Sequence, residues 1–302
     1  MKTLEAGKRI ALKNILFATD FSPYSNAALT YALAIARLYG AKLFGTHVVA
    51  SEDYLFTAPE SWPAHIQQEE QLQQEVTARL EEQLQGVPHE VLFGVGDVWK
   101  VLSRLIGEHD VDLIVVGTHG RTAARKLLMG SVAEKIFRLA TCPVLIVGPN
   151  VPSMKNGGRQ FQRILFATDF SNESLAALPY AVSLAEEDQS QLALLHVVKQ
   201  PSAGILDLEE VTASLVRRLK DLAPPEAQSW CHMEFLVEFG HLGQFAAPAE
   251  RIMEIARDRA ADLIVLGVRP THGAVGTVTH LAHTTAQHIV AHAACPVLTI
   301  RG

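Results

Sequence analysis

The 302-residue sequence contains one series of segments twice, in the same order. Ile15–Ser22 (ILFATDFS) returns unchanged as Ile164–Ser171. Three more pairs follow: HVV at 47–49 and 196–198, DLIVVG at 112–117 with DLIVLG at 262–267, and CPVL at 142–145 and 295–298. Matches that keep their order along the chain indicate duplication of a whole domain. A chain of this length can also bury two cores.

The duplication sets the domain boundaries that we expect. The first copy covers residues 1–149 and the second covers residues 163–302. Between them lies 150–162, a stretch that contains Pro, Gly and Asn and that we interpret as a linker. Each copy then has the size of an ordinary domain.

Short apolar runs alternate with helical patterns in each copy. In the first copy the runs are rich in Val, Ile and Leu, as is typical of strands covered on both faces. The expected strands are Asn14–Ala18, Leu43–Val49, Glu90–Phe93, Leu113–Val116 and Val144–Val147. The first expected helix begins after Ser22 and ends at Gly40. Three more are expected at Gln67–Gln85, Val98–Glu108 and Ser131–Ala140. Such alternation predicts an α/β fold with a doubly wound parallel sheet in each copy.

Composition narrows the class of protein. There are 26 basic and 32 acidic residues, which argues against sequence-independent nucleic-acid binding. We see neither an apolar run long enough to span a membrane nor a secretory leader. Three cysteines without a CxxC pair do not form a disulfide framework. We therefore expect a cytoplasmic protein with no nucleic-acid or membrane partner.

The most informative motif follows the fourth expected strand of the first copy. Gly117, Gly120, Gly130 and Ser131 form the pattern G-x-x-G-x9-G-S. Glycine lets a backbone approach a ligand closely, and the free N–H groups at a helix start attract phosphate. We expect Ser131 to cap the next helix. Asp20, at the end of the first strand, is placed for a ribose hydroxyl or a metal ion such as Mg²⁺.

These segments together resemble the universal stress protein family, and specifically its tandem members. The resemblance covers essentially the whole chain through ILFATDFS, HVV, DLIVVGTHG, GSVAEKI and CPVLIV. It implies a Rossmann-like, five-stranded parallel sheet of order 3-2-1-4-5 in each copy. It also implies pairing through the last strands, as an internal pseudo-dimer or a homo-oligomer. The glycine pattern is the ATP-binding signature of that family.

The resemblance further implies a set of nucleotide-binding positions in the first copy. Ala18 and Asp20 would line the ribose side, and Val48 would contact adenine through its backbone. The cleft for the base and ribose would be shaped by Val116, Gly117, His119 and Gly120. The phosphates would be held by Gly130, Ser131 and Val132. The full expected set is Ala18, Thr19, Asp20, Val48, Val116, Gly117, His119, Gly120, Arg121, Gly130, Ser131 and Val132.

The second copy departs from the glycine pattern. Gly267 is kept, but three extra residues precede the next glycine, Gly273. His283 then stands where the first copy has Gly130. An imidazole at a position of close backbone approach is expected to block a polyphosphate. We expect ATP in the first copy and either no ligand or a different one in the second.

Other functions remain open at this point. The sequence offers no general base or activated nucleophile, so we assign no catalytic residue, although slow ATP hydrolysis stays open. A second hypothesis is an adenylate-transferring enzyme, which the segment after the first strand disfavours because it lacks an HIGH-like or PP-loop motif. A third is a nucleotide-independent structural or chaperone-like stress protein.

His288 and His292 share the i,i+4 spacing of zinc ligands but lack converging partners.

Overall fold

The computed structural model describes residues 10–50, 62–118, 129–154, 161–198, 207–239, 247–269 and 285–302. It divides into two compact units. The first comprises residues 12–147, and the second comprises residues 148–302 together with the described residues 10 and 11.

The first unit alternates strands and helices as the repeat pattern predicts. Its strands are β1 (Asn14–Ala18), β2 (Lys42–Val49), β3 (His89–Val95), β4 (Leu113–Gly117) and β5 (Val144–Val147). Its helices are α1 (Pro23–Tyr39), α2 (Trp62–Gln83), α3 (Val98–Glu108) and α4 (Ser131–Leu139). The strands β1 and β5 and the helices α1 and α3 match the expected bounds, and the other elements differ from them by a few residues at one or both ends.

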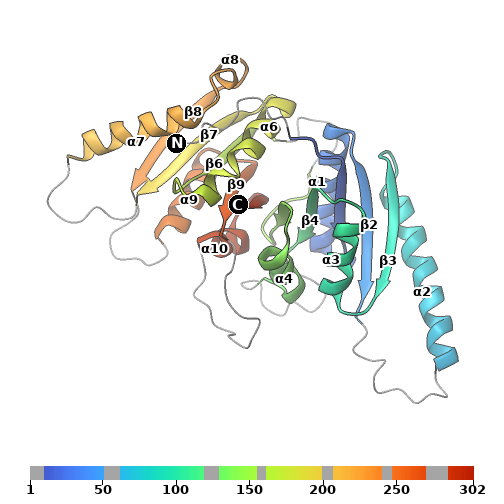
Figure 1. The fold of residues 1–302 in the computed structure, drawn as a ribbon. Helices are drawn as coiled ribbons and strands as arrows, with labels where there is room; N and C mark the ends of the chain where they lie inside the picture. Colours follow the sequence, from blue (N-terminus) through green and yellow to red (C-terminus); the bar gives the residue numbers. More distant parts are fainter. Residues whose placement is uncertain are drawn as a thin grey trace. The chain divides into compact units, whose positions relative to one another are not determined.

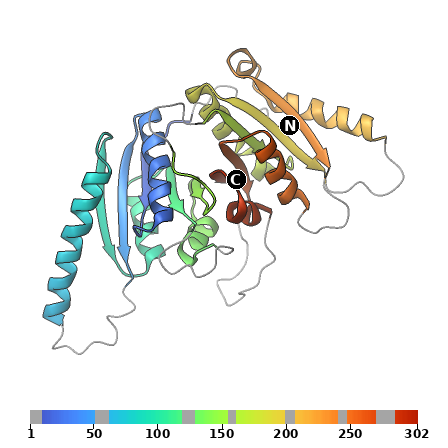
Figure 2. The ribbon, with the colours of Figure 1, turned by 180° about the vertical axis from the view of Figure 1, so that it is seen from behind.

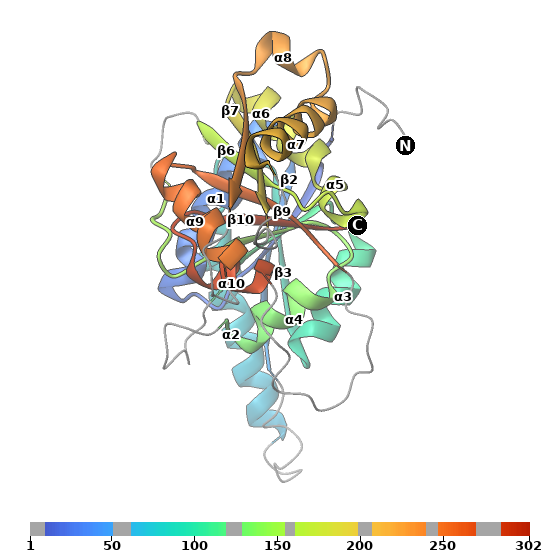
Figure 3. The ribbon, with the colours of Figure 1, turned by 90° about the vertical axis from the view of Figure 1, so that its left-hand side faces the viewer.

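The sheet of the first unit has the order β3-β2-β1-β4-β5, and its strand pairs are parallel. This confirms the expected order 3-2-1-4-5. Every residue of β4 and β5 is buried, because helices cover both faces of the central strands. The helices α3 and α4 lie in front of the sheet in Figure 1, and α1 comes to the front in Figure 2. Figure 3 also shows α3 and α4 side by side.

Helix boundaries in the first unit follow from their end residues. The Ser22 side chain accepts a hydrogen bond from the N–H of Ser25 and caps α1, as expected. Gly40 ends the same helix in the left-handed conformation, with φ at 62°. Val76 and Leu80 of α2 are buried in the core, as is Leu84 directly after the helix.

The second unit repeats this architecture with one interruption. Its strands are β6 (Arg163–Ala167), β7 (Gln191–Val198), β8 (Met233–Phe239), β9 (Leu263–Val268) and β10 (Val297–Arg301), in the order β10-β9-β6-β7-β8. Its helices are α5 (Asn172–Leu175), α6 (Leu178–Asp188), α7 (Leu208–Leu222), α8 (Ala227–Trp230), α9 (Ala247–Asp258) and α10 (Thr285–His292). Pro179, in the first turn of α6, splits the counterpart of α1 because proline has no N–H to continue a helix.

None of the helices in the described part of the chain is long and apolar enough to cross a membrane.

Candidate functional site

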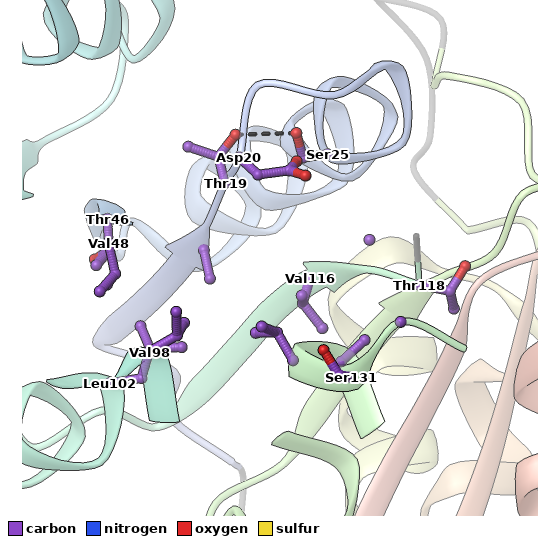
Figure 4. Close-up of a pocket in the computed structure, with 15 residues that line it drawn as sticks. Thr19, Asp20, Ser25, Thr46, Val48, Val98, Leu102, Val116, Thr118 and Ser131 are labelled. Carbon is purple, nitrogen blue, oxygen red and sulfur yellow. Dashed lines mark hydrogen bonds between the residues drawn. The ribbon is translucent and has the colours of Figure 1, made fainter. Parts of the chain in front are cut away.

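A cavity of about 280 Å³ lies at the carboxyl ends of the strands in the first unit. Its walls come from the ends of β1, β2 and β4 and from the first turns of α1, α3 and α4. In Figure 4, Val48, Val98 and Leu102 gather at one end and Thr118 and Ser131 at the other. Ligands of doubly wound sheets bind at this place, where the connections on either side of the first strand diverge to opposite faces.

The structure brings most of the predicted binding residues together around this cavity. The lining includes Ala18, Thr19, Asp20, Val48, Val116, Gly117, Gly130, Ser131 and Val132. The other three predicted residues, His119, Gly120 and Arg121, lie outside the described part of the chain.

The start of α4 forms the polar end of the cavity. Gly130, not Ser131, is the N-cap of this helix, and Gly130 has no side chain with which to cap it. The expectation that Ser131 caps the helix is therefore wrong, because Ser131 is already in the first helical turn. Within the described residues, no hydrogen bond occupies the N–H groups of Ser131, Val132 and Ala133. These donors and the positive end of the helix dipole form a seat for an anion.

Gly117 has a packing role that the sequence did not indicate. A Cβ at this position would lie 3.0 Å from the backbone carbonyl carbon and oxygen of Tyr24 and 3.1 Å from the Ser25 nitrogen. The end of β4 therefore needs glycine so that the first turn of α1 can approach it. The requirement is stronger in the second unit, where a Cβ on Gly267 would overlap the backbone of α5.

Asp20 stands in a turn that hydrogen bonds hold in place. Its Oδ1 accepts the N–H of Ser22 at 3.0 Å, and the Thr19 hydroxyl donates to Ser25 Oγ at 3.0 Å. Both Asp20 and Thr19 line the cavity, as Figure 4 shows. The turn thus presents a carboxylate and a hydroxyl group to any ligand bound between β1 and β4.

Six further residues line the cavity although sequence reasoning missed them: Ser25, Thr46, Val98, Leu102, Thr118 and Ala133. Val98 and Leu102 are four residues apart on α3, so they share the helix face that meets the cavity. That spacing, directly after an expected strand, was the signal available for them. Thr46 required the strand register, which pairs it with Ala18.

Helices α3 and α4 are also tied across the surface. Lys135 Nζ on α4 lies 3.5 Å from Asp97 Oδ2, at the N-cap of α3. A hydrogen bond from the Lys100 N–H, helped by the charge of Lys135, lowers the pKa of the Asp97 carboxyl. Since both side chains are about half exposed, the pair contributes little stability.

An ion pair lies at the corresponding end of the second unit. Arg269 lies 3.5 Å from Asp169, the counterpart of Asp20. Burial raises the pKa of Asp169, but hydrogen bonds from Ser171 and Ser174 and the charge of Arg269 outweigh it and bring the pKa below its usual value. The carboxylate that would face a ribose is therefore engaged by a guanidinium group. His283 and the extra loop residues lie outside the described residues.

The two units also differ at one position of their edge strands, β3 and β8. In the first unit Gly94 on β3 packs beneath Val101 of α3, and a Cβ on Gly94 would meet the Val101 side chain. In the second unit β8 has Glu238 at the same register position, because Val197 pairs with it as Val48 pairs with Gly94. Arg251 of α9 bonds this carboxylate at 2.6 Å. An apolar contact beside the first cavity has thus become an ion pair.

The histidine pair of α10 and two of the cysteines show no sign of metal binding or reactivity in the described residues. The His288 and His292 rings stack at 4.4 Å, and His292 Nδ1 lies 2.8 Å from the His288 carbonyl oxygen. Among the residues that the structure describes, no cluster of potential metal ligands is found. Burial raises the pKa of Cys142 to about 11 and that of Cys295 to about 12, so neither thiol is activated.

Two parallel sheets of this order, one of which ends in a ligand-sized cavity, define a duplicated doubly wound α/β protein. The chain belongs to the universal stress protein family, whose model matches residues 11–148 and again 160–301.

Individual relatives agree with this assignment. Universal stress protein A homolog 1 of Coxiella burnetii is 35% identical over 138 residues, which are 45% of this chain and 95% of that protein. A universal stress protein of Thermus aquaticus is 35% identical over 140 residues, 45% of this chain and 98% of that one. The crystal structure of a universal stress protein from Archaeoglobus fulgidus, 22% identical, covers 95% of this chain and 96% of its own with a TM-score of 0.68. This last likeness bears on the fold.

Proposed function

We propose that the first unit binds an adenine nucleotide, ATP, and that the protein acts as a nucleotide-responsive stress module. The anion seat at the start of α4 carries the proposal, because glycine at the N-cap leaves its N–H groups open to the cavity. Proteins of this family often bind adenine nucleotides.

Each part of the cavity fits one part of such a ligand. The N–H groups of Ser131, Val132 and Ala133 would donate to the terminal phosphates. Asp20 would accept a hydrogen bond from a ribose hydroxyl or hold Mg²⁺, which shields phosphate charge when bound. The apolar end beside Val48 matches the flat face of a base.

The second unit supports a different role. Its Asp169 is paired with Arg269, and the Glu238–Arg251 pair replaces an apolar contact near the position of the base. We infer that this half does not bind ATP in the manner of the first. These ion pairs favour a nucleotide-independent structural role for this half. The same role is the alternative function for the whole chain.

Equilibrium binding tests both statements. Isothermal titration of the full chain with Mg-ATP is expected to give one site per chain, and mass spectrometry of the purified protein should identify a carried adenine nucleotide. Two equal sites would refute the assignment of roles to the halves. Absence of binding by ATP, ADP and AMP would refute the nucleotide proposal and leave the structural role. Turnover measured at saturating ATP separates a binding module from a slow ATPase.

A further inference from the structure

Both units contain the same strained turn after their first strand. Phe21 has φ at 60°, and Phe170, its counterpart, has φ at 61°. An aromatic side chain disfavours this left-handed region, which is otherwise used by glycine and asparagine. Such a conformation persists only where neighbouring contacts hold it, and it is a reason to look for a function.

The contacts that hold the turn are also repeated. In the first unit the Phe21 N–H donates to Thr19 Oγ1 at 2.9 Å, and His47 Nδ1 lies 2.7 Å from the Thr19 carbonyl oxygen. The Phe21 ring then packs against the His47 ring, with centroids 5.1 Å apart, and the guanidinium carbon of Arg79 lies 4.2 Å above the Phe21 ring. We call Phe21, His47 and Arg79 the turn cluster.

The second unit has the same cluster in the same geometry. Phe170 packs against His196 at 4.6 Å, and Arg218 lies 4.0 Å above the Phe170 ring. The Phe170 N–H donates to Thr168 Oγ1 at 2.9 Å, and His196 Nδ1 lies 2.8 Å from the Thr168 carbonyl oxygen. The arginines come from helices α2 and α7, far along the chain from the turns they cover.

In the first unit this turn positions part of the cavity wall. Thr19 and Asp20 line the cavity and immediately precede Phe21. If the backbone of Phe21 relaxed to an ordinary φ, the peptide that joins it to Asp20 would rotate and the carboxylate would leave its place. Arg79 stacks on the ring and opposes that relaxation, as a cation does over an aromatic face.

We propose that Arg79 is a positioning residue for the nucleotide site, holding Asp20 in its binding orientation through the Phe21 ring. The inference rests on the proposed nucleotide function. It links helix α2, which the cavity does not include, to occupancy of the cavity. Arg218 makes the same contact in the unit whose Asp169 is already paired with Arg269, so it provides a matched control.

The test compares Mg-ATP affinity and thermal unfolding of the full chain in single variants. Loss of an exposed cation–ring contact corresponds to about a two- to five-fold change in an equilibrium constant. Arg79→Ala is expected to weaken ATP binding by about that factor because fewer molecules hold the turn correctly. Arg218→Ala should leave ATP affinity unchanged, while it lowers the thermal unfolding midpoint about as much as Arg79→Ala does. Arg79→Lys, which keeps a cation over the ring, should restore affinity toward that of the unchanged protein.

A double-mutant cycle shows whether Arg79 acts through the ring. Phe21→Leu should weaken ATP binding, and adding Arg79→Ala should then have no further effect. Equal affinities of Arg79→Ala and the unchanged protein would overturn the inference, as would equal losses in both arginine variants. If the unchanged protein binds no ATP, the proposed function fails by itself. Backbone amide NMR shifts of residues 19–22 then decide the positioning role: they should move in Arg79→Ala, and unchanged shifts would refute it.

Discussion

Replacing Gly130 with aspartate is expected to change stability and ATP binding in opposite directions. Gly130 caps α4 with φ at −63° and ψ at 150°, a conformation open to any residue. An aspartate there would accept hydrogen bonds from the first-turn N–H groups and face the positive end of the helix dipole. Better capping and the dipole together predict a rise of about 0.5–1 kcal/mol in the free energy of unfolding.

The same carboxylate would occupy the anion seat. Two like charges about 4 Å apart repel by about 1 kcal/mol in water and about 4 kcal/mol at the effective dielectric constant near a protein surface. We therefore expect ATP affinity to fall at least about tenfold, since about 1.4 kcal/mol is a factor of ten. Gly130→Asn is the matched control, because asparagine also caps the helix but adds no charge. Its loss of affinity should be clearly smaller.

Urea unfolding and isothermal titration with Mg-ATP measure the two effects. The loss in Gly130→Asp should also shrink as salt rises, because mobile ions screen the repulsion. The reasoning fails if Gly130→Asp binds ATP as tightly as Gly130→Asn, since charge at the helix start would then play no part. A fall in stability would show that Gly130 serves the fold in a way that its N-cap geometry does not reveal.

Two further predictions concern stability. Gly267→Ala should lower the free energy of unfolding by about 1–3 kcal/mol, because the added Cβ would overlap the backbone of α5. Gly117→Ala should lower it less, since the nearest backbone atoms there are 3.0 Å from the added Cβ. Urea unfolding of both variants measures the two losses, and a larger loss in Gly117→Ala would contradict the prediction. The Val87 carbonyl and the Glu81 carboxylate raise the pKa of His89 above 6.5. The protonated His89 therefore stabilises the fold below pH 6.5, and this stabilisation is lost as the pH rises through the raised pKa of the folded protein. Glu81→Gln should lower the free energy of unfolding by about 0.5 kcal/mol or less near pH 5.5 and by almost nothing near pH 8. A loss of stability that did not depend on pH would be evidence against this reasoning.

Much of the fold could be predicted because local patterns and global topology agree. The buried strand β4 is a continuous apolar run that needs no knowledge of its partners. The start of α1 was also local, since Ser22 is followed by Pro23 at the first helical turn. The family resemblance then supplied the strand order.

The remainder of the site depends on contacts between distant segments. The left-handed Phe21 contradicts its own propensity, and two of the contacts that hold it come from other elements, through Arg79 and His47. Gly117 looks like a ligand contact in the sequence, whereas its requirement comes from the backbone of Tyr24. The change from Gly94 to Glu238 between the two copies becomes visible only when the strand registers are aligned.

The Gly130 N–H donates to the Thr118 carbonyl oxygen at 2.7 Å, which joins the end of β4 to the start of α4. The two ends of the intervening sequence are therefore held together at one point. The entropic penalty of joining the two ends of a chain segment grows only slowly with its length. Evolution can thus lengthen or rewrite the intervening sequence without disturbing the sheet, and the second copy carries three more residues there. A peptide grafted at this junction would test how much foreign sequence the scaffold accepts.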